Sequence, residues 1–114
     1  MSQAEIDVLA ERQRQIFVEG WDEAHDERHE AGDLAMAGIC YALGPAHVHI
    51  PMPIYGRFFG FREGYTKAGE GKIAWPWDPK WWKPKDRRRD LVRAAALIIA
   101  EIDRHDREVR DESK

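Results

Sequence analysis

The sequence has one cysteine, no long uninterrupted apolar run and no excess of positive charge. A lone Cys40 cannot form an internal disulfide, and the N-terminal segment has no apolar core of a signal peptide, so we expect a cytoplasmic protein. The longest charge-free stretch, residues 34–53, is broken by glycine, proline and histidine, which excludes a spanning helix of about 20 apolar residues. The net charge of -3 excludes the broad positive field on which binding of extended nucleic acid depends.

The 114 residues fit one domain, and three stretches carry helical signals. Residues 3–19 follow a Ser-x-x-Glu capping box and end at Gly20, residues 33–43 end before Gly44, and residues 87–107 follow Asp86, which fits an N-cap. We therefore predict a mainly α, compact three-helix single domain, residues 1–114, with a charged tail fraying from about residue 107 to 114. The apolar positions predicted to face the core are Ile6, Leu9, Ile16 and Phe17, then Leu34, Ala37, Cys40 and Tyr41, then Leu91, Ala94, Ala95, Ile98 and Ile102, widened by Val92, Ala96 and Ile99.

Residues 45–74 lie between the second and third helices and contain proline and glycine too often for a helix. Aromatic residues alternate with them, which predicts an ordered insertion with a small aromatic core. Aromatic side chains on a loop would leave an apolar patch, so we expect a homo-oligomer. The aromatic stretch 54–65 could instead bind and inhibit a host protein.

Five tryptophans are present, four of them between Trp75 and Trp82, and the block leads into a basic helix start. Residues 75–93 contain seven basic and three acidic residues, a local charge of +4. Because tryptophan rings stack on bases and arginine binds phosphate, the block predicts binding of a small nucleotide-like anion, without chemistry and without a cofactor. The predicted ligand-binding residues are Trp81, Trp82, Lys83, Arg88 and Arg89, joined by Trp21, His25, Asp26 and His29.

A structural role competes with this interpretation. Turns rich in tryptophan and proline often pack as rigid lids over small cores. The arginines could also pair with the acidic segment 19–33, whose seven acids and one arginine give a local charge of -6.

An enzymatic alternative rests on the same acidic segment. On a helix, His25, His29 and Asp33 would share one face and could hold a metal ion. Glu27-x-x-Glu30 is half of the carboxylate set that holds magnesium in all-α nucleoside-triphosphate pyrophosphohydrolases, but Glu101 is followed by Arg104 where that set needs an aspartate. A metal-dependent nucleotide hydrolase therefore remains an alternative, whereas a buried Cys40 thiol is expected to be inert.

Two sets of motifs remain, and the first consists of Glu19-Gly20-Trp21, His25-Asp26-x-x-His29-x-x-Gly32-Asp33-Leu34, Trp75-Pro76-Trp77-Asp78, Trp81-Trp82-Lys83-Pro84 and Arg88-Arg89-Asp90-Leu91-Val92. The first set is similar to a family of small phage and prophage proteins, some of which carry the module beside a dATP/dGTP pyrophosphohydrolase-like domain; the resemblance implies a phage-encoded accessory protein that sequesters a nucleotide signal of host defence. A weaker similarity, through Gly20-Trp21 and Asp86-Arg87, links the chain to RyR-type (ryanodine receptor) helical domains.

Overall fold

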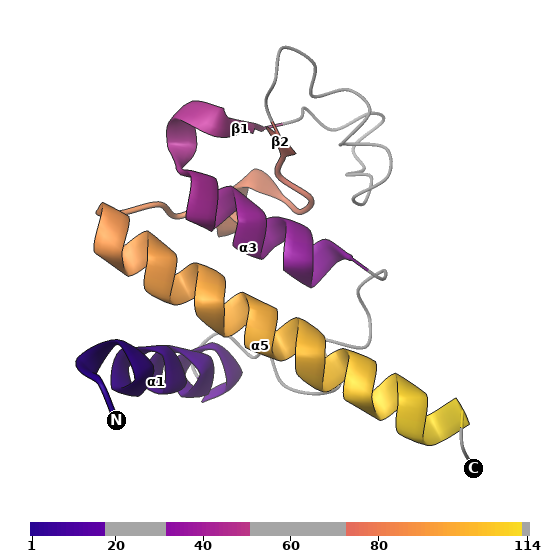
Figure 1. Ribbon diagram of the computed structural model, residues 1–114. Helices are drawn as coiled ribbons and strands as arrows, with labels where there is room; N and C mark the ends of the chain where they lie inside the picture. Colours follow the sequence, from indigo (N-terminus) through magenta and orange to yellow (C-terminus); the bar gives the residue numbers. More distant parts are fainter. Residues whose placement is uncertain (18–31, 51–72, 113–114) are drawn as a thin grey trace.

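A computed structural model describes residues 1–17, 32–50 and 73–112, and α-helices dominate these residues. The long helix α5 lies between α3 on one side and α1 on the other (Figure 1). The described residues thus confirm the predicted mainly α, three-helix domain. The elements are α1 (Gln3–Phe17), α3 (Asp33–Leu43), the 3₁₀ helix η1 (Pro45–His47), β1 (Val48–His49), β2 (Ile73–Ala74), the 3₁₀ helix η2 (Pro79–Trp81) and α5 (Arg87–Glu112).

The helix starts follow the predicted capping signals. At α1, the Glu5 backbone N–H donates to Ser2 Oγ at 3.1 Å, and the Ser2 N–H donates to the Glu5 carboxylate at 3.0 Å. At α5, the Arg89 N–H donates to Asp86 Oδ1 at 2.9 Å. These bonds satisfy N–H groups that have no partner inside the helix, which confirms the capping box and the Asp86 N-cap. The predicted stop at Gly20 lies outside the described residues.

The second helix ends where the sequence places its stop. Gly44 has a φ of 97°, a conformation that favours glycine, and its N–H donates to the Cys40 carbonyl at 3.0 Å. The chain then enters a short parallel strand pair, with Val48 opposite Ile73. Val48 is buried, so the ends of the predicted insertion belong to the packed domain. Its middle, residues 51–72 with the aromatic stretch 54–65, lies outside the described residues.

The core is built from α3, α5 and the tryptophan block. Trp75 is fully buried, and its ring meets Tyr41 edge-on with centroids 5.6 Å apart. Helices α3 and α5 approach closely at Gly38, where a Cβ would lie 3.1 Å from Ile98 Cδ1 and 3.2 Å from the Ala94 carbonyl oxygen. The absence of a side chain at Gly38 therefore lets the two helices pack closely at this point. Residues of the core cluster are Leu34, Ala37, Cys40, Tyr41, Val48, Trp75, Trp77, Ala94, Leu97 and Ala100.

The prediction of which α5 residues are buried is wrong for the larger side chains of the stripe. Leu91, Ile98 and Ile102 are 42%, 38% and 53% exposed. Helix α5 instead turns its small side chains toward α3, because alanine allows the backbones to approach and the tryptophan rings fill the remaining volume. The α5 residues that are buried and apolar are Val92, Ala94, Ala96, Leu97 and Ala100.

Helix α1 also differs from the prediction. Its buried residues are Glu11, Arg12 and Gln15, whereas the predicted core residues Ile6, Leu9 and Phe17 are 45%, 48% and 79% exposed. The polar face of α1 is turned inward because α5 presents arginines at that contact, and buried charges need partners. The predicted helix is therefore confirmed over residues 3–17, but the prediction of which helix face lies against the core is wrong.

Helix α5 continues to Glu112, past the end predicted at Arg107. Arg104 pairs with Glu101 at 2.7 Å and with Glu108 at 3.0 Å, and such pairs one turn apart support a helix at its surface. The C-terminal part of α5 projects beyond the other two helices (Figure 1). Among the described residues, no helix combines the length and apolar character that crossing a membrane requires.

Candidate functional site

Three of the clustered tryptophans are packing residues. Trp75 and Trp77 are buried, with ring centroids 5.5 Å apart in an edge-on arrangement. The ring of Trp82 lies 4.8 Å from Tyr41 and 4.9 Å from Trp75, and it is partly buried against the core. The Trp75 indole N–H donates to the Asp78 carbonyl at 3.1 Å. Trp75 and Trp77 are therefore part of the core, and Trp82 packs against it, which agrees with a structural role for much of the tryptophan block.

Trp81 is also partly buried against the core, but it has two cationic neighbours. The ammonium groups of Lys80 and Lys83 each lie 5.4 Å from the centroid of its ring. These are cation–π distances. We call Lys80, Trp81 and Lys83 the Trp81 platform: one aromatic ring flanked by two positive charges at the surface.

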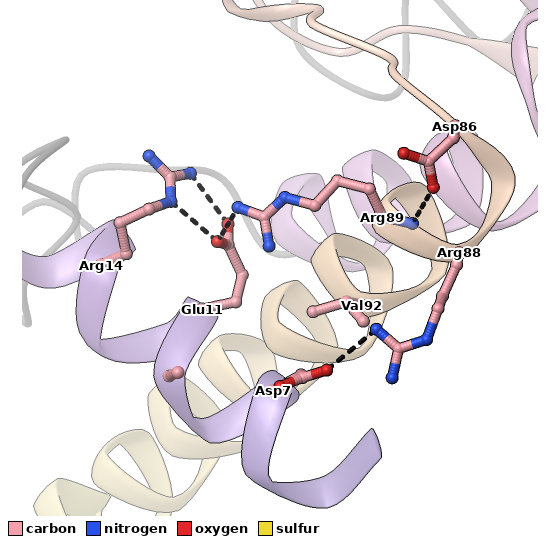
Figure 2. Close-up of a pocket in the computed structure, with 8 residues that line it drawn as sticks. Asp7, Glu11, Arg14, Asp86, Arg88, Arg89 and Val92 are labelled. Atoms are coloured by element: carbon pink, nitrogen blue, oxygen red, sulfur yellow. Dashed lines mark hydrogen bonds and ion pairs between the residues drawn. The ribbon is translucent and has the colours of Figure 1, made fainter. Parts of the chain in front are cut away.

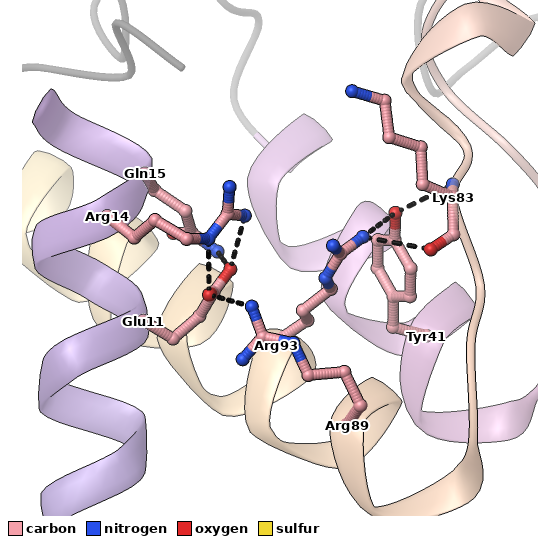
Figure 3. A network of polar contacts seen from close by, with 7 residues as sticks. All are labelled: Glu11, Arg14, Gln15, Tyr41, Lys83, Arg89 and Arg93. Atoms are coloured by element: carbon pink, nitrogen blue, oxygen red, sulfur yellow. Dashed lines mark hydrogen bonds and ion pairs between the residues drawn. The ribbon is translucent and has the colours of Figure 1, made fainter. Parts of the chain in front are cut away.

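Buried polar groups hold the backbone of the platform in place (Figure 3). The Tyr41 hydroxyl donates to the Trp81 carbonyl at 3.2 Å and accepts from the Lys83 N–H at 3.0 Å. Arg93 Nη1 donates to the Lys83 carbonyl at 2.9 Å and to the Tyr41 hydroxyl at 3.4 Å. Because both Tyr41 and Arg93 are buried, the platform is fixed to α3 and α5 from beneath.

The start of the platform is fixed by a turn of its own. Asp78 caps η2, with its Oδ1 accepting from the Lys80 N–H at 2.9 Å. Pro79 occupies the first turn of η2, where its fixed φ suits a helix start. The sequence thus encodes a rigid turn that presents Trp81.

The two predicted arginines lie elsewhere, in a groove of about 440 Å³ between α1 and the start of α5 (Figure 2). Arg88 Nη1 pairs with Asp7 Oδ2 at 2.8 Å, and Arg89 Nη2 pairs with Glu11 Oε1. Arg14 Nε and Nη2 also donate to the Glu11 carboxylate, at 2.7 and 2.8 Å. The groove is lined by Asp7, Ala10, Glu11, Arg14, Asp86, Arg88, Arg89 and Val92.

Glu11 is the electrostatic centre of this groove. Its side chain is fully buried, and it also accepts from Gln15 Nε2 at 3.1 Å. Burial alone would raise the pKa of Glu11, but the hydrogen bonds and charges of Arg14 and Arg89 outweigh that effect and hold the pKa below its ordinary 4.5. Glu11 is thus an ionised anchor for α1. Three arginines and three carboxylates line the groove, so it offers an anion no net positive charge.

The structure separates the predicted site residues into two groups. Trp82 and the Trp81 carbonyl meet Tyr41 of α3, whereas Arg88 and Arg89 meet carboxylates of α1. The groove lined by the two arginines includes no platform residue. Predicted residues that lie outside the described ones are Trp21, His25, Asp26 and His29, together with Glu27 and Glu30 of the hydrolase alternative.

Sequence reasoning missed Lys80, Tyr41 and Arg93. Lys80 could have been found, because it precedes Trp81 in the same basic block. Tyr41 was assigned to the core, and nothing in its local sequence shows that its hydroxyl reaches a turn 40 residues away.

The described part of the chain holds no cluster of three metal-ligating side chains, and its one cysteine is buried. Within residues 1–17, 32–50 and 73–112, no three histidine, cysteine, aspartate or glutamate side chains are placed to hold a metal ion. Asp33 is buried in the first turn of α3. Cys40 is buried, its Sγ donates to the Ala74 carbonyl at 3.7 Å, and desolvation raises the pKa of the thiol to about 12. This thiol is not a nucleophile at neutral pH, as predicted.

Comparisons with protein-family models, curated proteins and solved structures give no match.

Proposed function

We propose that the protein binds a small nucleotide-derived anion at the Trp81 platform and holds it without chemical conversion. The observation that carries the proposal is the pair of ammonium groups, from Lys80 and Lys83, each 5.4 Å from the ring centroid of the partly exposed Trp81. An aromatic face with two adjacent cations matches a ligand that has both a base and a phosphate.

The magnitudes favour exchange of the lysine contacts for ligand contacts. A lysine–tryptophan contact at an exposed site contributes about 0.5–1 kcal/mol. Stacking of one base on an aromatic side chain contributes about 1–3 kcal/mol. A base that displaces the ammonium groups from the ring therefore gains stacking. Each lysine then turns toward the phosphate, with which its charge-assisted hydrogen bond is stronger than the cation–π contact that it gives up.

The anchoring beneath the platform supports binding as well. Tyr41 and Arg93 fix the backbone from Trp81 to Lys83, so ligand binding requires the ordering of lysine side chains only. Less ordering on binding leaves more of the interaction energy as affinity. Such a prearranged turn suits capture of a scarce signal, which agrees with the sequestration that the phage-protein resemblance implies.

The proposed function leaves Arg88 and Arg89 in a structural role. Both are already paired with α1 carboxylates, and their use for phosphate would require release of Asp7 or Glu11. The metal-dependent hydrolase and the inhibitor of a host protein remain predictions, since they depend mainly on residues outside the described ones.

Isothermal titration calorimetry of the full chain tests the proposal. The ligands are adenosine and guanosine mono- and diphosphates, cyclic dinucleotides, ADP-ribose and, separately, inorganic phosphate. We expect one nucleotide class to bind more tightly than about 1 mM, and Trp81→Ala to weaken it about tenfold or more, which corresponds to 1.4 kcal/mol. Chromatography of the ligand after incubation should recover it unchanged.

The lysine variants have a matched control. Lys80→Ala combined with Lys83→Ala should weaken binding, whereas Lys85→Ala should not, because Lys85 is an exposed lysine of the same segment and has no described contact with the Trp81 ring. Absence of binding across the panel, or equal affinity of Trp81→Ala and the unchanged protein, would overturn the proposal. Conversion of the nucleotide would replace it with the hydrolase alternative.

A further inference from the structure

The exposed apolar residues of α5 lie on one narrow stripe. Large hydrophobic side chains remain 38–53% exposed along this helix. At 100° per residue their positions fall within an arc of about 80°, together with the smaller Ala95 and the polar His105. The stripe is formed by Leu91, Ala95, Ile98, Ile102, His105 and Val109.

The spacing along the stripe is that of a coiled-coil seam. From residue 91 to 109 the intervals alternate between four and three residues, which is the heptad pattern of a helix that packs against another helix. The contact of α5 with α3 buries Ala94, Leu97 and Ala100, and Ile98 lies at its edge, beside Gly38. The rest of the seam, and the exposed part of Ile98, are left over after the described core has formed.

The C-terminal part of α5 adds to the exposed apolar surface of the seam. From Ile102 to Glu112, each residue is exposed or only partly buried. Ion pairs one turn apart contribute only about 0.2–0.5 kcal/mol each, and an isolated helix shorter than about 12 residues is marginal in water. A further packing partner would give Ile102 and Val109 the burial that the described chain does not supply.

The charges along α5 indicate how that partner is oriented. Residues 85–93 contain five basic and two acidic residues, a net charge of +3. Residues 101–112 contain three basic and six acidic residues, a net charge of -3. This order opposes the helix macrodipole, which favours acids at the N-terminus and bases at the C-terminus. A second α5 running antiparallel would set each charged end against its opposite.

We propose that the seam is the interface of an antiparallel homodimer in which α5 packs against α5 of a second copy. In a two-fold arrangement centred between Ile98 and Ile102, these two isoleucines of one copy meet Ile102 and Ile98 of the other. The same register sets the small Ala95 opposite the larger His105, and Leu91 opposite Val109. Arg88, 61% exposed at its side chain, then faces the acidic end of the other copy at Glu112.

The proposal is independent of the proposed function. The Trp81 platform is anchored on Tyr41 of α3 and Arg93 of α5, and both residues are buried. Arg93 lies on a different face of α5 from the seam. Loss of dimerisation would therefore leave ligand binding intact, and loss of ligand binding through Trp81→Ala would leave the dimer intact.

Sedimentation equilibrium of the full chain over a concentration series is the first test. We expect a mass twice the 13.3 kDa of one chain, falling to one chain in Ile102→Lys, where two lysines would enter the interface by symmetry. Lysine is a good helix former and residue 102 is exposed, so helicity by circular dichroism should be unchanged. The matched control is Leu9→Lys, which alters a similarly exposed apolar residue of α1 and should leave the dimer in place.

Cysteine cross-linking tests the orientation. Leu91→Cys combined with Val109→Cys should form an intermolecular disulfide on mild oxidation, while neither single variant should do so. Cys40 is buried and its pKa is about 12, so it does not compete. A monomer at all concentrations, or a dimer that Ile102→Lys leaves unchanged, would overturn the interface. Cross-linking by the single variants would overturn the antiparallel orientation.

Discussion

Helix α5 makes two contacts of opposite character. Toward α3 and the tryptophan block it buries alanine and leucine, and Trp75 there is fully buried. Toward α1 it presents Arg88 and Arg89 to acidic side chains. The same helix is thus held on one side by apolar packing and on the other by ion pairs. The difference shows that helical amphipathicity alone does not say which force docks a helix.

The two contacts should differ in strength and in their response to solvent. Full burial of a large apolar side chain contributes about 1.5–3 kcal/mol, with little dependence on pH or salt. A buried ion pair contributes little on balance, because the cost of removing both charges from water offsets their attraction. We therefore expect α1 to detach from α5 under conditions that leave the contact with α3 intact.

The largest effect is expected on the apolar side. Trp75→Ala removes a fully buried ring that contacts Tyr41, Trp77 and Trp82, and should lower the free energy of unfolding by about 3–5 kcal/mol. Urea denaturation followed by circular dichroism measures it. The matched control is Trp81→Ala, which truncates a partly exposed ring and should cost less. Equal losses in the two variants would contradict the assignment of Trp75 to the core.

An intermediate effect is expected at Glu11. Its folded-state pKa lies below 4.5, so its charged form stabilises the folded protein above that pH, and this contribution is lost as the pH falls through the lowered pKa. Amide hydrogen exchange should show protection of residues 3–17 failing in acid before that of residues 33–43. Glu11→Gln should lower the free energy of unfolding at neutral pH by about 1–2 kcal/mol, a figure reduced from that of a fully buried pair because both arginines are partly exposed.

The pH dependence supplies the control for Glu11. In Glu11→Gln, the amides of residues 3–17 should have low protection factors at neutral pH. These protection factors, taken relative to the intrinsic exchange rate at each pH, should change little on acidification. Glu108→Gln, at a half-exposed carboxylate of α5, should behave as the unchanged protein does. Equal protection of residues 3–17 in Glu11→Gln and the unchanged protein would show that α1 is not docked by this charge.

The smallest effect is expected at the exposed pair. Arg88→Ala removes the ion pair with Asp7, in which the arginine side chain is 61% exposed, and should change the free energy of unfolding by less than about 1 kcal/mol. Salt screens exposed charges, so the difference between this variant and the unchanged protein should shrink between 0.05 and about 1 M salt. Thermal unfolding at several salt concentrations measures it. A large, salt-independent loss would place Arg88 in the packed core.

The sequence by itself determined where α1 and α5 begin and where α3 ends. Ser2 with Glu5, Asp86 and Gly44 act within one helical turn, so their chemistry does not depend on the rest of the chain. It also indicated that α3 allows a close approach, since Gly38 and the neighbouring alanines have little or no side chain. The basic and aromatic composition that defines the Trp81 platform was readable for the same local reason.

Only the tertiary structure decided which face of each helix is buried and which tryptophans form the core. Helix α5 carries two overlapping apolar stripes, and α3 selects the one with alanine because only small side chains let the backbones meet. Trp75 and Trp82 pack their rings against Tyr41, a residue of another helix, and Trp77 packs against Trp75. Periodicity gives the direction of each side chain around its own helix, whereas burial depends on neighbours that arrive from 40 or more residues away.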